Sequence, residues 1–359
     1  MAYSIKITKA AQSKVSEVDF SNIPFGKIFS DHIFVADYDG KQWTNLEIKP
    51  LEKMPLHPAT MAWHYGQAIF EGMKAGKSAD GVPLLFRPQL HAQRMNASAK
   101  RMCMPEIPED LFIQALEQLL LIDKDWIPTQ SDSALYLRPV MMATDEFIGV
   151  RSSETFRFMI LALPSGPYYN KPVGLWVEEH FVRAADGGVG EAKAAGNYGA
   201  ALYPTKLARD KGYDQVMWMD ARDFKYVQES GTMNVFFLTK NAVLTPNLSG
   251  TILRGITRDS IIQILKDNGY KVEERPVSID EIIEAHTKGE LLEVFGTGTA
   301  AVIAQIHRIG YHGKDYHINA PEDGVAAMLK SSINGIRQGR LQDKHDWVWP
   351  VEQKSAVLA

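Results

Sequence analysis

The chain has a single cysteine, no long apolar run and little net charge. With one cysteine in 359 residues, Cys103, it can form no disulfide within itself, and a cysteine-rich zinc site is excluded. No stretch approaches the ~20 apolar residues that span a bilayer, and the first fifteen residues lack the apolar core of a secretion signal. A net charge of -4 gives no broad attraction to nucleic acid or anionic lipid. These absences predict a cytoplasmic protein with small-molecule partners, and neither nucleic acid nor membrane among them.

What is present is an ordinary globular composition, 45% hydrophobic and 23% charged. At ~150 residues per domain, a chain of this length predicts two domains. The densest cluster of proline and glycine lies at 164–172, where we expect the connection between them. The expected division is therefore a small N-terminal domain at 1–163, a linker at 164–176 and a larger C-terminal domain at 177–359.

Apolar periodicity predicts both helices and strands, and hence the α/β (α+β) class. The expected helices are Pro88–Met104, Pro108–Ile122, Ile256–Asn268 and one that starts at a capping box of Ser278 and Glu281. The expected strands are Ile28–Tyr38, Ser133–Met142, Thr155–Leu163, Gln215–Met219, Val235–Leu238 and Leu291–Phe295.

Three segments rich in small residues are unusual in their own right. In 187–199 a single lysine, Lys193, stands among glycines and alanines that leave room for a flat ligand beside its amine. In 293–301 a glycine-threonine turn follows a strand, and 250–258 leads into a helix start, so both offer backbone NH groups to a phosphate. Each has a plain alternative: a flexible surface loop, a tight connection, or a helix start that binds nothing. Glu229, between two expected strands, is by itself typical of a solvated turn.

Taken in order along the chain, short motifs match one enzyme family. They are Phe25-Gly26-Lys27, Phe70-Glu71-Gly72-Met73-Lys74, Leu85-Phe86-Arg87-Pro88 and Leu135-Tyr136-Leu137-Arg138-Pro139, followed by the lysine, Glu229 and glycine-threonine segments. On these residues the chain resembles the branched-chain amino acid aminotransferases, pyridoxal-phosphate enzymes of fold type IV, over nearly its whole length. The resemblance implies a two-domain fold like that of the D-amino-acid aminotransferases, with a small α/β domain and a larger pseudo-barrel domain that binds the cofactor.

The reaction that this resemblance implies is a reversible, ping-pong transfer of an amino group. L-leucine, L-isoleucine or L-valine gives its amino group to 2-oxoglutarate, and the products are branched-chain 2-oxo acids and L-glutamate. Lys193 corresponds to the lysine that carries pyridoxal 5'-phosphate as a Schiff base and then shuttles the proton, for which its amine must be uncharged. An arginine at this position could not form the imine, and a glutamine has no nucleophilic amine.

The resemblance also assigns the other contacts of the cofactor. Glu229 matches the carboxylate that keeps the pyridine nitrogen protonated, and Tyr198 matches the tyrosine at the phenolic oxygen. Arg94 and the helix start at 256–257 match the phosphate-binding groups. The full expected cofactor-binding set is Arg94, Arg183, Lys193, Tyr198, Glu229, Thr232, Ile256, Thr257 and Thr299.

The substrate pocket has to accept both an apolar side chain and the acidic side chain of glutamate. The family combines aromatic residues with one reachable arginine, which matches Arg138. By the same resemblance, Tyr65 and the backbone of Thr299 and Ala300 are expected to bind the α-carboxylate of the substrate. The full expected substrate-binding set is Phe25, Tyr65, Tyr136, Arg138, Val150, Tyr168, Thr299 and Ala300.

The resemblance further implies a homodimer in which Val150 and its neighbours complete the pocket of the partner. No metal is expected, because His57, His64 and His91 lack the spacing of metal ligands. Where mammalian members carry a redox-active pair of cysteines, this chain has Ala301-Val302-Ile303-Ala304, so no thiol switch is expected there.

Two alternatives remain at this point. D-amino-acid aminotransferases and aminodeoxychorismate lyases share the lysine, the glutamate and the phosphate site, although the Tyr136-Leu137-Arg138 segment favours the branched-chain group. A phosphate- or nucleotide-binding protein without chemistry at Lys193 is the alternative from another class, but the chain has no Walker-type motif.

Overall fold

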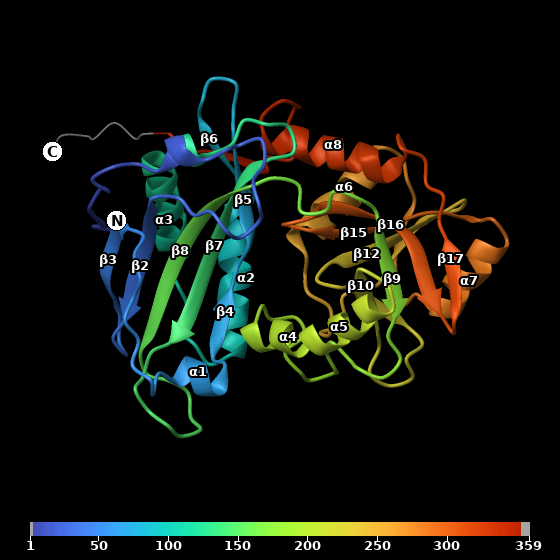
Figure 1. Cartoon of the computed structure of the whole chain (residues 1–359), viewed down its shortest axis with the longest axis horizontal. Coiled ribbons are helices and arrows are strands. Elements are labelled where there is room, and N and C mark those ends of the chain that lie inside the picture. The colour runs from blue at the N-terminus through green and yellow to red at the C-terminus, as the bar shows by residue number, and fades with distance from the viewer. Residues whose placement is uncertain (1–2, 353–359) are drawn as a thin grey trace. The chain divides into compact units, whose positions relative to one another are not determined.

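The computed structural model describes residues 3–352, whose contacts divide the chain into two compact units (Figure 1). The first unit gathers the described residues of Met1–Tyr168, Lys193–Ala195 and Asn334–Ala359, and the second consists of Tyr169–Ala192 and Gly196–Ile333. The chain first passes from the first unit to the second after Tyr168, which lies within the expected linker 164–176. Strands occupy both ends of that linker, so that only 166–172 lie outside them.

The expected division differs from the structure at two places. Residues 334–352 pack with the first unit, because their strand Val348–Pro350 pairs with Pro83–Phe86. The three residues Lys193–Ala195 also belong to the first unit, where Ala194 forms an antiparallel bridge with Ile69. Both contacts join residues far apart in the sequence, which composition along the chain does not reveal.

The first unit contains a sheet with the strand order β1-β3-β2-β8-β7-β5-β6-β18, and β4 pairs with β7 beside it. Its strands are β1 (Lys6–Ile7), β2 (His32–Tyr38), β3 (Trp43–Pro50), β4 (Ala68–Phe70), β5 (Met73–Lys77), β6 (Pro83–Phe86), β7 (Ala134–Ala143), β8 (Phe156–Ser165) and β18 (Val348–Pro350). Its helices are η1 (Val15–Glu17), α1 (Met61–Tyr65), α2 (Pro88–Arg101), α3 (Glu109–Ile122), η2 (Lys124–Trp126) and the end of α8 (Val325–Arg337).

Helices α2 and α3 bury their apolar faces in one core with the sheet of this unit. On α3 the residues spaced at 111, 112, 115, 116 and 119 are all buried, as their helical periodicity predicts. Phe112 stacks on Phe158 of β8, with 5.9 Å between the ring centroids. Helix α2 starts at Pro88 as expected but ends at Arg101, because Cys103 takes a left-handed backbone conformation with φ 53°. The core thus fixes α2, which carries Arg94.

The second unit contains a sheet with the strand order β11-β10-β9-β16-β15-β12-β13-β14, and β17 pairs with β16. Its strands are β9 (Val173–Val177), β10 (Gln215–Met219), β11 (Val227–Ser230), β12 (Asn234–Thr239), β13 (Val243–Thr245), β14 (Val272–Glu274), β15 (Leu291–Gly298), β16 (Val302–Tyr311) and β17 (Lys314–His317). Its helices are α4 (Ala195–Ala200), which begins in the first unit, α5 (Leu202–Asp210), α6 (Ile256–Asp267), α7 (Ile279–Thr287) and most of α8.

Two helix starts of the second unit follow their sequence signals. Ser278 Oγ accepts the NH of Glu281 at 3.1 Å, which forms the expected cap of α7. Helix α6 begins at Ile256 behind Gly255 and ends at Asp267. The mixture of helices with two sheets, one per unit, confirms the expected α/β (α+β) class.

The glycine-threonine segment is where the sequence interpretation needs correction. Strand β15 does not end at Phe295 but runs through Gly296, Thr297 and Gly298, which pair with β16, and the turn is confined to 299–301. A Cβ on Gly296 would lie 2.8 Å from Met233 Cε, so glycine here permits close packing rather than a turn. None of the helices in 3–352 combines the length and apolarity needed to cross a membrane.

Candidate active site

Lys193 lies in the first unit, and its backbone is fixed on both sides. Its NH donates to Ser98 Oγ of α2 at 3.0 Å, and its carbonyl accepts the NH of Phe70 at 3.1 Å. Its Nζ lies 4.6 Å from the centroid of the Phe70 ring. The lysine is therefore half-buried on a segment that β4 and α2 hold in place, and the alternative of a flexible loop does not apply to it.

The guanidinium of Arg138, on β7, lies over the same Phe70 ring, with its Cζ 4.5 Å from the ring centroid. Arg138 Nη2 donates to the hydroxyl of Tyr136 at 3.0 Å. Its Nε is buried and meets no hydrogen-bond partner among the described residues. A buried NH group of this kind favours an anionic ligand beside the arginine.

Three of the expected pocket residues form one aromatic cluster in the first unit. Phe25 meets Tyr136 edge-on at 5.3 Å and Tyr168 edge-on at 5.0 Å. A Cβ on Gly72 would lie only 2.1 Å from the Tyr136 hydroxyl, so the position of this tyrosine requires glycine at 72. The cluster places apolar ring faces next to the single guanidinium of Arg138, as a pocket for both apolar and acidic side chains requires.

Two expected pocket residues of the first unit stand apart from this cluster. Tyr65 ends α1 with 38% of its surface exposed, and its ring centroid lies 6.2 Å from that of His64. Val150 is 92% exposed at the tip of the loop between β7 and β8. The structure of one chain thus leaves Val150 without the neighbours that a pocket residue needs.

Arg94, expected to bind phosphate, makes a close ion pair within the first unit. Its Nε donates to Glu71 Oε1 at 2.7 Å, and its Nη2 donates to Glu71 Oε2 at 2.8 Å. His91, one turn earlier on α2, donates from Nδ1 to the same Oε2 at 2.8 Å. The sequence interpretation quoted Glu71 in a motif but gave it no role.

In the second unit, four of the expected cofactor residues line one pocket. Its lining is Arg183, Ala192, Asn197, Tyr198, Ala201, Glu229, Gly231, Thr232 and Leu253. Glu229 lies on β11, paired with Trp218 of β10, and is 3% exposed. Its Oε1 accepts the NH of Leu253 at 2.7 Å, and its Oε2 lies 3.3 Å from Arg183 Nε in an ion pair. The alternative of a solvated turn residue is therefore excluded for Glu229.

Hydrogen bonds to two backbone carbonyls hold the side chain of Arg183 in position. Its Nη2 donates to the carbonyl of Gly190 at 3.0 Å and also to that of Thr251. Asn197 Nδ2 donates to the carbonyls of Val189 and Ala192, which holds the same glycine-rich stretch. Asn197 was not anticipated, although its place four residues after the lysine was a usable signal.

The start of α6 carries the expected phosphate contacts Ile256 and Thr257. Gly255 forms its N-cap without a side-chain bond, and both Ile256 and Thr257 are buried. Asn234 Nδ2 donates to the Leu253 carbonyl at 3.0 Å and so fixes the loop before the helix. A 12-residue helix with an uncapped start suits an anion. Thr299 and Ala300 lie in the hairpin turn of this unit.

Comparison with known proteins places the chain in a family. The family model of class IV aminotransferases matches residues 68–309. The branched-chain-amino-acid aminotransferase 2 of Bacillus subtilis is 44% identical over 344 residues, which cover 94% of this chain and 95% of that protein. The branched-chain-amino-acid aminotransferase of Mycolicibacterium smegmatis is 40% identical over 95% of both chains.

Solved structures show the same fold. The branched-chain amino acid aminotransferase of Escherichia coli has a TM-score of 0.73 at 25% identity, covering 90% of this chain and 99% of that one. The enzyme of Thermobaculum terrenum in its PLP form also has a TM-score of 0.73, at 23% identity, covering 91% and 100%. Together with the lysine, glutamate and arginine geometry, these matches show that the chain belongs to the class IV aminotransferases, a family of pyridoxal-phosphate-dependent transaminases, and within it to the branched-chain amino acid aminotransferases.

Proposed function

We propose that the chain transfers the amino group of L-leucine, L-isoleucine or L-valine to 2-oxoglutarate in a reversible ping-pong reaction. Its products are the branched-chain 2-oxo acids and L-glutamate. The observation that carries the proposal is the Phe70 ring, which has the Lys193 amine at 4.6 Å and the Arg138 guanidinium at 4.5 Å. An apolar surface between an amine and one arginine suits both substrates, because the arginine can pair with the side-chain carboxylate of glutamate.

The donor set of the chain fits pyridoxal 5'-phosphate. The cofactor, when bound, supplies an aldehyde and an electron-withdrawing ring that makes the α-proton of an amino acid removable. Lys193 would provide the amine that holds it, and the same Nζ would take the α-proton of the amino acid and return it. The fixed backbone of Lys193 anchors the base of its side chain, so the amine remains within reach of the same position in both proton transfers.

The pocket of the second unit, with Glu229 and Tyr198 in its lining, suits the ring of the cofactor. Glu229 would hold the proton at the ring nitrogen, and its ion pair with Arg183, together with the NH of Leu253, orients its carboxylate. Tyr198 would donate to the phenolic oxygen, and Thr232 lines the same pocket. For the phosphate we propose Arg94, Thr299 and the NH groups of Ile256 and Thr257.

For the substrate we propose Phe25, Tyr136, Tyr168 and Arg138 around the side chain, as the cluster in the first unit supports. Tyr65 and the backbone of Thr299 and Ala300 would hold the α-carboxylate. We also propose a cytoplasmic location, since a chain with a single cysteine suits a reducing compartment.

The substrate assignment has a direct test. The purified enzyme should transaminate L-leucine, L-isoleucine and L-valine with 2-oxoglutarate, and the three rates should differ by no more than about 200-fold, because one methylene is worth about 1–3 kcal/mol of selectivity. D-alanine should give no product above the blank. The reaction is followed by chromatographic measurement of glutamate. Turnover of D-alanine at a rate similar to that of L-leucine would show that the chain has the D-amino-acid activity of its fold instead.

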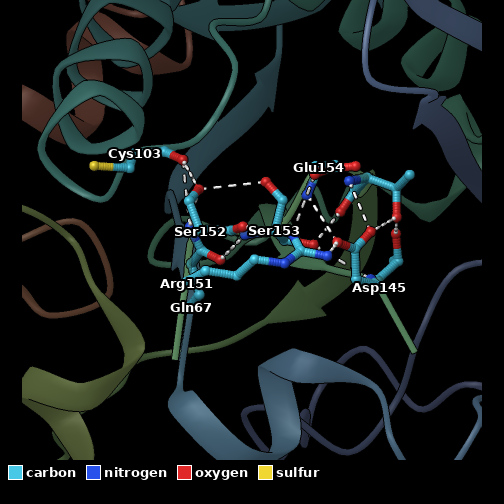
Figure 2. A network of polar contacts seen from close by, with 9 residues as sticks. Gln67, Cys103, Asp145, Arg151, Ser152, Ser153 and Glu154 are labelled. Atoms are coloured by element: carbon cyan, nitrogen blue, oxygen red, sulfur yellow. Dashed lines mark hydrogen bonds and ion pairs between the residues drawn. The ribbon is translucent and has the colours of Figure 1, made fainter. Parts of the chain in front are cut away.

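We further propose that the enzyme is a homodimer and that Val150 reaches the partner. The base of its loop is locked by the polar network in Figure 2. Asp145 accepts the NH groups of Glu154 at 2.9 Å and Thr155 at 3.0 Å, and Arg151 Nη2 pairs with it at 2.9 Å. Burial raises the pKa of Asp145, but the hydrogen bonds from the Thr155 hydroxyl, from these NH groups and from Arg151 outweigh it and hold that pKa below its usual range.

The other side of the loop base is equally well held (Figure 2). Gln67 accepts the NH of Ser153 at 3.1 Å, and Ser152 Oγ donates to the carbonyl of Cys103 at 2.7 Å. On this rigid base stand three exposed apolar side chains, those of Phe147, Ile148 and Val150. A fixed apolar tip in solvent is typical of a contact surface for another chain.

A charge at the tip tests this proposal. Val150→Asp should leave the fold intact, because the side chain is 92% exposed, but should weaken the dimer and raise KM for L-leucine by about tenfold. Light scattering during size exclusion measures the dimer, and initial rates give KM. Ile7→Asp, at an exposed apolar residue of β1, is the control and should change neither. A monomeric wild type, or a dimeric variant with unchanged KM, would contradict the proposal.

A further inference from the structure

Glu71 is a fully buried carboxylate to which the proposed reaction gives no part. It lies between β4 and β5 with no exposed surface. Its Oε1 accepts Arg94 Nε at 2.7 Å, and its Oε2 accepts Arg94 Nη2 and His91 Nδ1, each at 2.8 Å. The NH of Gly72 adds a longer bond to Oε2 at 3.2 Å. Both oxygens are thus occupied, and two of these bonds go to a single guanidinium.

A buried carboxylate is costly unless charge and hydrogen bonds compensate for it. Burial raises the pKa of Glu71, but the charge of Arg94 and the bonds from Arg94 and His91 outweigh it and hold that pKa well below its usual range. For His91, burial dominates and lowers the pKa. Near neutral pH, Glu71 is therefore ionised and His91 is neutral, with its proton on Nδ1, where it donates to the carboxylate.

This arrangement restrains the orientation of Arg94. Two parallel bonds to one carboxylate fix the plane of a guanidinium, and His91 and Gly72 fix the carboxylate in turn. An unrestrained arginine loses rotamer freedom when it binds a ligand, which weakens binding. In this chain Glu71 removes that freedom beforehand, because the Arg94 side chain is only 10% exposed and already oriented.

We propose that Glu71 is the positioning residue that presents Arg94 to the phosphate group of the cofactor, with His91 holding the Glu71 carboxylate. The inference rests on the proposed function, which gives Arg94 to the phosphate. Its consequence is specific: loss of the Glu71 charge should weaken binding of the phosphorylated cofactor far more than binding of the same ring without phosphate. A carboxylate needed only for folding would affect both ligands alike.

The test is a pair of titrations of the full-length protein freed of cofactor. Pyridoxal 5'-phosphate and pyridoxal are each added while protein fluorescence and visible absorption are recorded. The Kd of pyridoxal divided by the Kd of pyridoxal 5'-phosphate measures the preference for phosphate. Glu71→Gln should reduce this ratio by about tenfold or more, with the Kd of pyridoxal within about threefold of wild type. Glu71→Asp keeps the charge but withdraws it by one methylene, and should give a smaller reduction.

A matched control and a second background complete the design. Asp37 makes the same kind of bidentate pair with Arg157, at 2.7 and 3.2 Å, outside the proposed site, so Asp37→Asn should leave the ratio unchanged. In an Arg94→Ala protein, Glu71→Gln should cause no further reduction, since the group that it positions is gone.

Several outcomes would overturn the inference. Equal weakening of both ligands by Glu71→Gln and Glu71→Asp would make Glu71 structural. An undiminished effect in the Arg94→Ala background would show that it does not act through Arg94. If Glu71→Gln does not fold, as circular dichroism reveals, Glu71→Asp decides alone. A wild type that binds neither ligand would instead overturn the proposed function, and this inference with it.

Discussion

Lys193→Ala should abolish transamination almost completely while the protein stays folded. In the proposed mechanism the side chain supplies both the amine that holds the cofactor and the base that moves the α-proton, and its Nζ lies over the Phe70 ring beside the proposed substrate pocket. Loss of both tasks should lower kcat by about 10⁴-fold or more, equivalent to about 5 kcal/mol of barrier. Because Lys193 is half-buried and its backbone bonds survive the change, Tm should move by no more than about 3 °C.

Steady-state rates and the visible absorption band of the bound cofactor measure this prediction. Both should be lost together in Lys193→Ala. Lys77→Ala provides the control, since Lys77 is a partly buried lysine of the same unit, on β5. It should retain the band and near-normal kcat. Lys193→Ala with a normal band and more than about 1% of wild-type kcat would refute the assignment of Lys193.

Glu229→Gln should lower kcat/KM for L-leucine by about 10²- to 10³-fold, equivalent to about 3–4 kcal/mol. Glutamine keeps the shape and can still accept the NH of Leu253, but it lacks the charge that, in the proposed function, holds a proton at the ring nitrogen. The change also leaves Arg183 without its ion-pair partner at 3.3 Å, so the free energy of unfolding should fall by about 1–3 kcal/mol. Rates must therefore be compared well below Tm.

The control for Glu229→Gln is another buried carboxylate of the second unit. Glu178 is 6% exposed and accepts the NH groups of His180 at 2.9 Å and Phe181 at 3.1 Å, away from the proposed pocket. Glu178→Gln should cost a similar amount of stability and leave kcat/KM within about threefold. Equal activity losses in the two variants would mean that Glu229 acts only on stability.

Local sequence signals predicted the elements whose stability is local. Helix α3 has its apolar residues at helical spacing, α7 has the Ser278 cap, and α6 begins at Ile256 as expected, because caps and periodicity act within a few residues. Strand β10 occupies the predicted residues Gln215–Met219. Strand β3 and helix α8 were not identified, although both contribute to their sheet or core.

The errors arose where a distant contact decides the local structure. Glycines 296 and 298 suggested a turn, yet they pair with β16 in a strand packed against Met233. Likewise, the glycines and alanines around Lys193 gave no sign that Phe70 and Ser98, about a hundred residues earlier, hold its backbone. Such contacts follow from tertiary structure, so the lysine itself was recognisable from the sequence but its support was not.

The same pattern holds for the candidate site. Arg138, Glu229 and Lys193 were identified from motifs, and Arg183, Tyr198 and Thr232 prove to line one pocket with Glu229. Glu71 was visible in a motif, but its role depends on a carboxylate position that only the packing of α2 against β4 creates. Motifs thus predicted which residues share a pocket better than they predicted what orients those residues.

The discontinuous make-up of the first unit bears on how the protein is made. Its strand β18 lies at residues 348–350, so β6, its partner at 83–86, is synthesised long before it. The second unit, contained in 169–333, is fully synthesised before the first is complete. Early-emerging strands such as β6 therefore wait for their partner with an open edge, a period in which chaperones would protect the nascent chain.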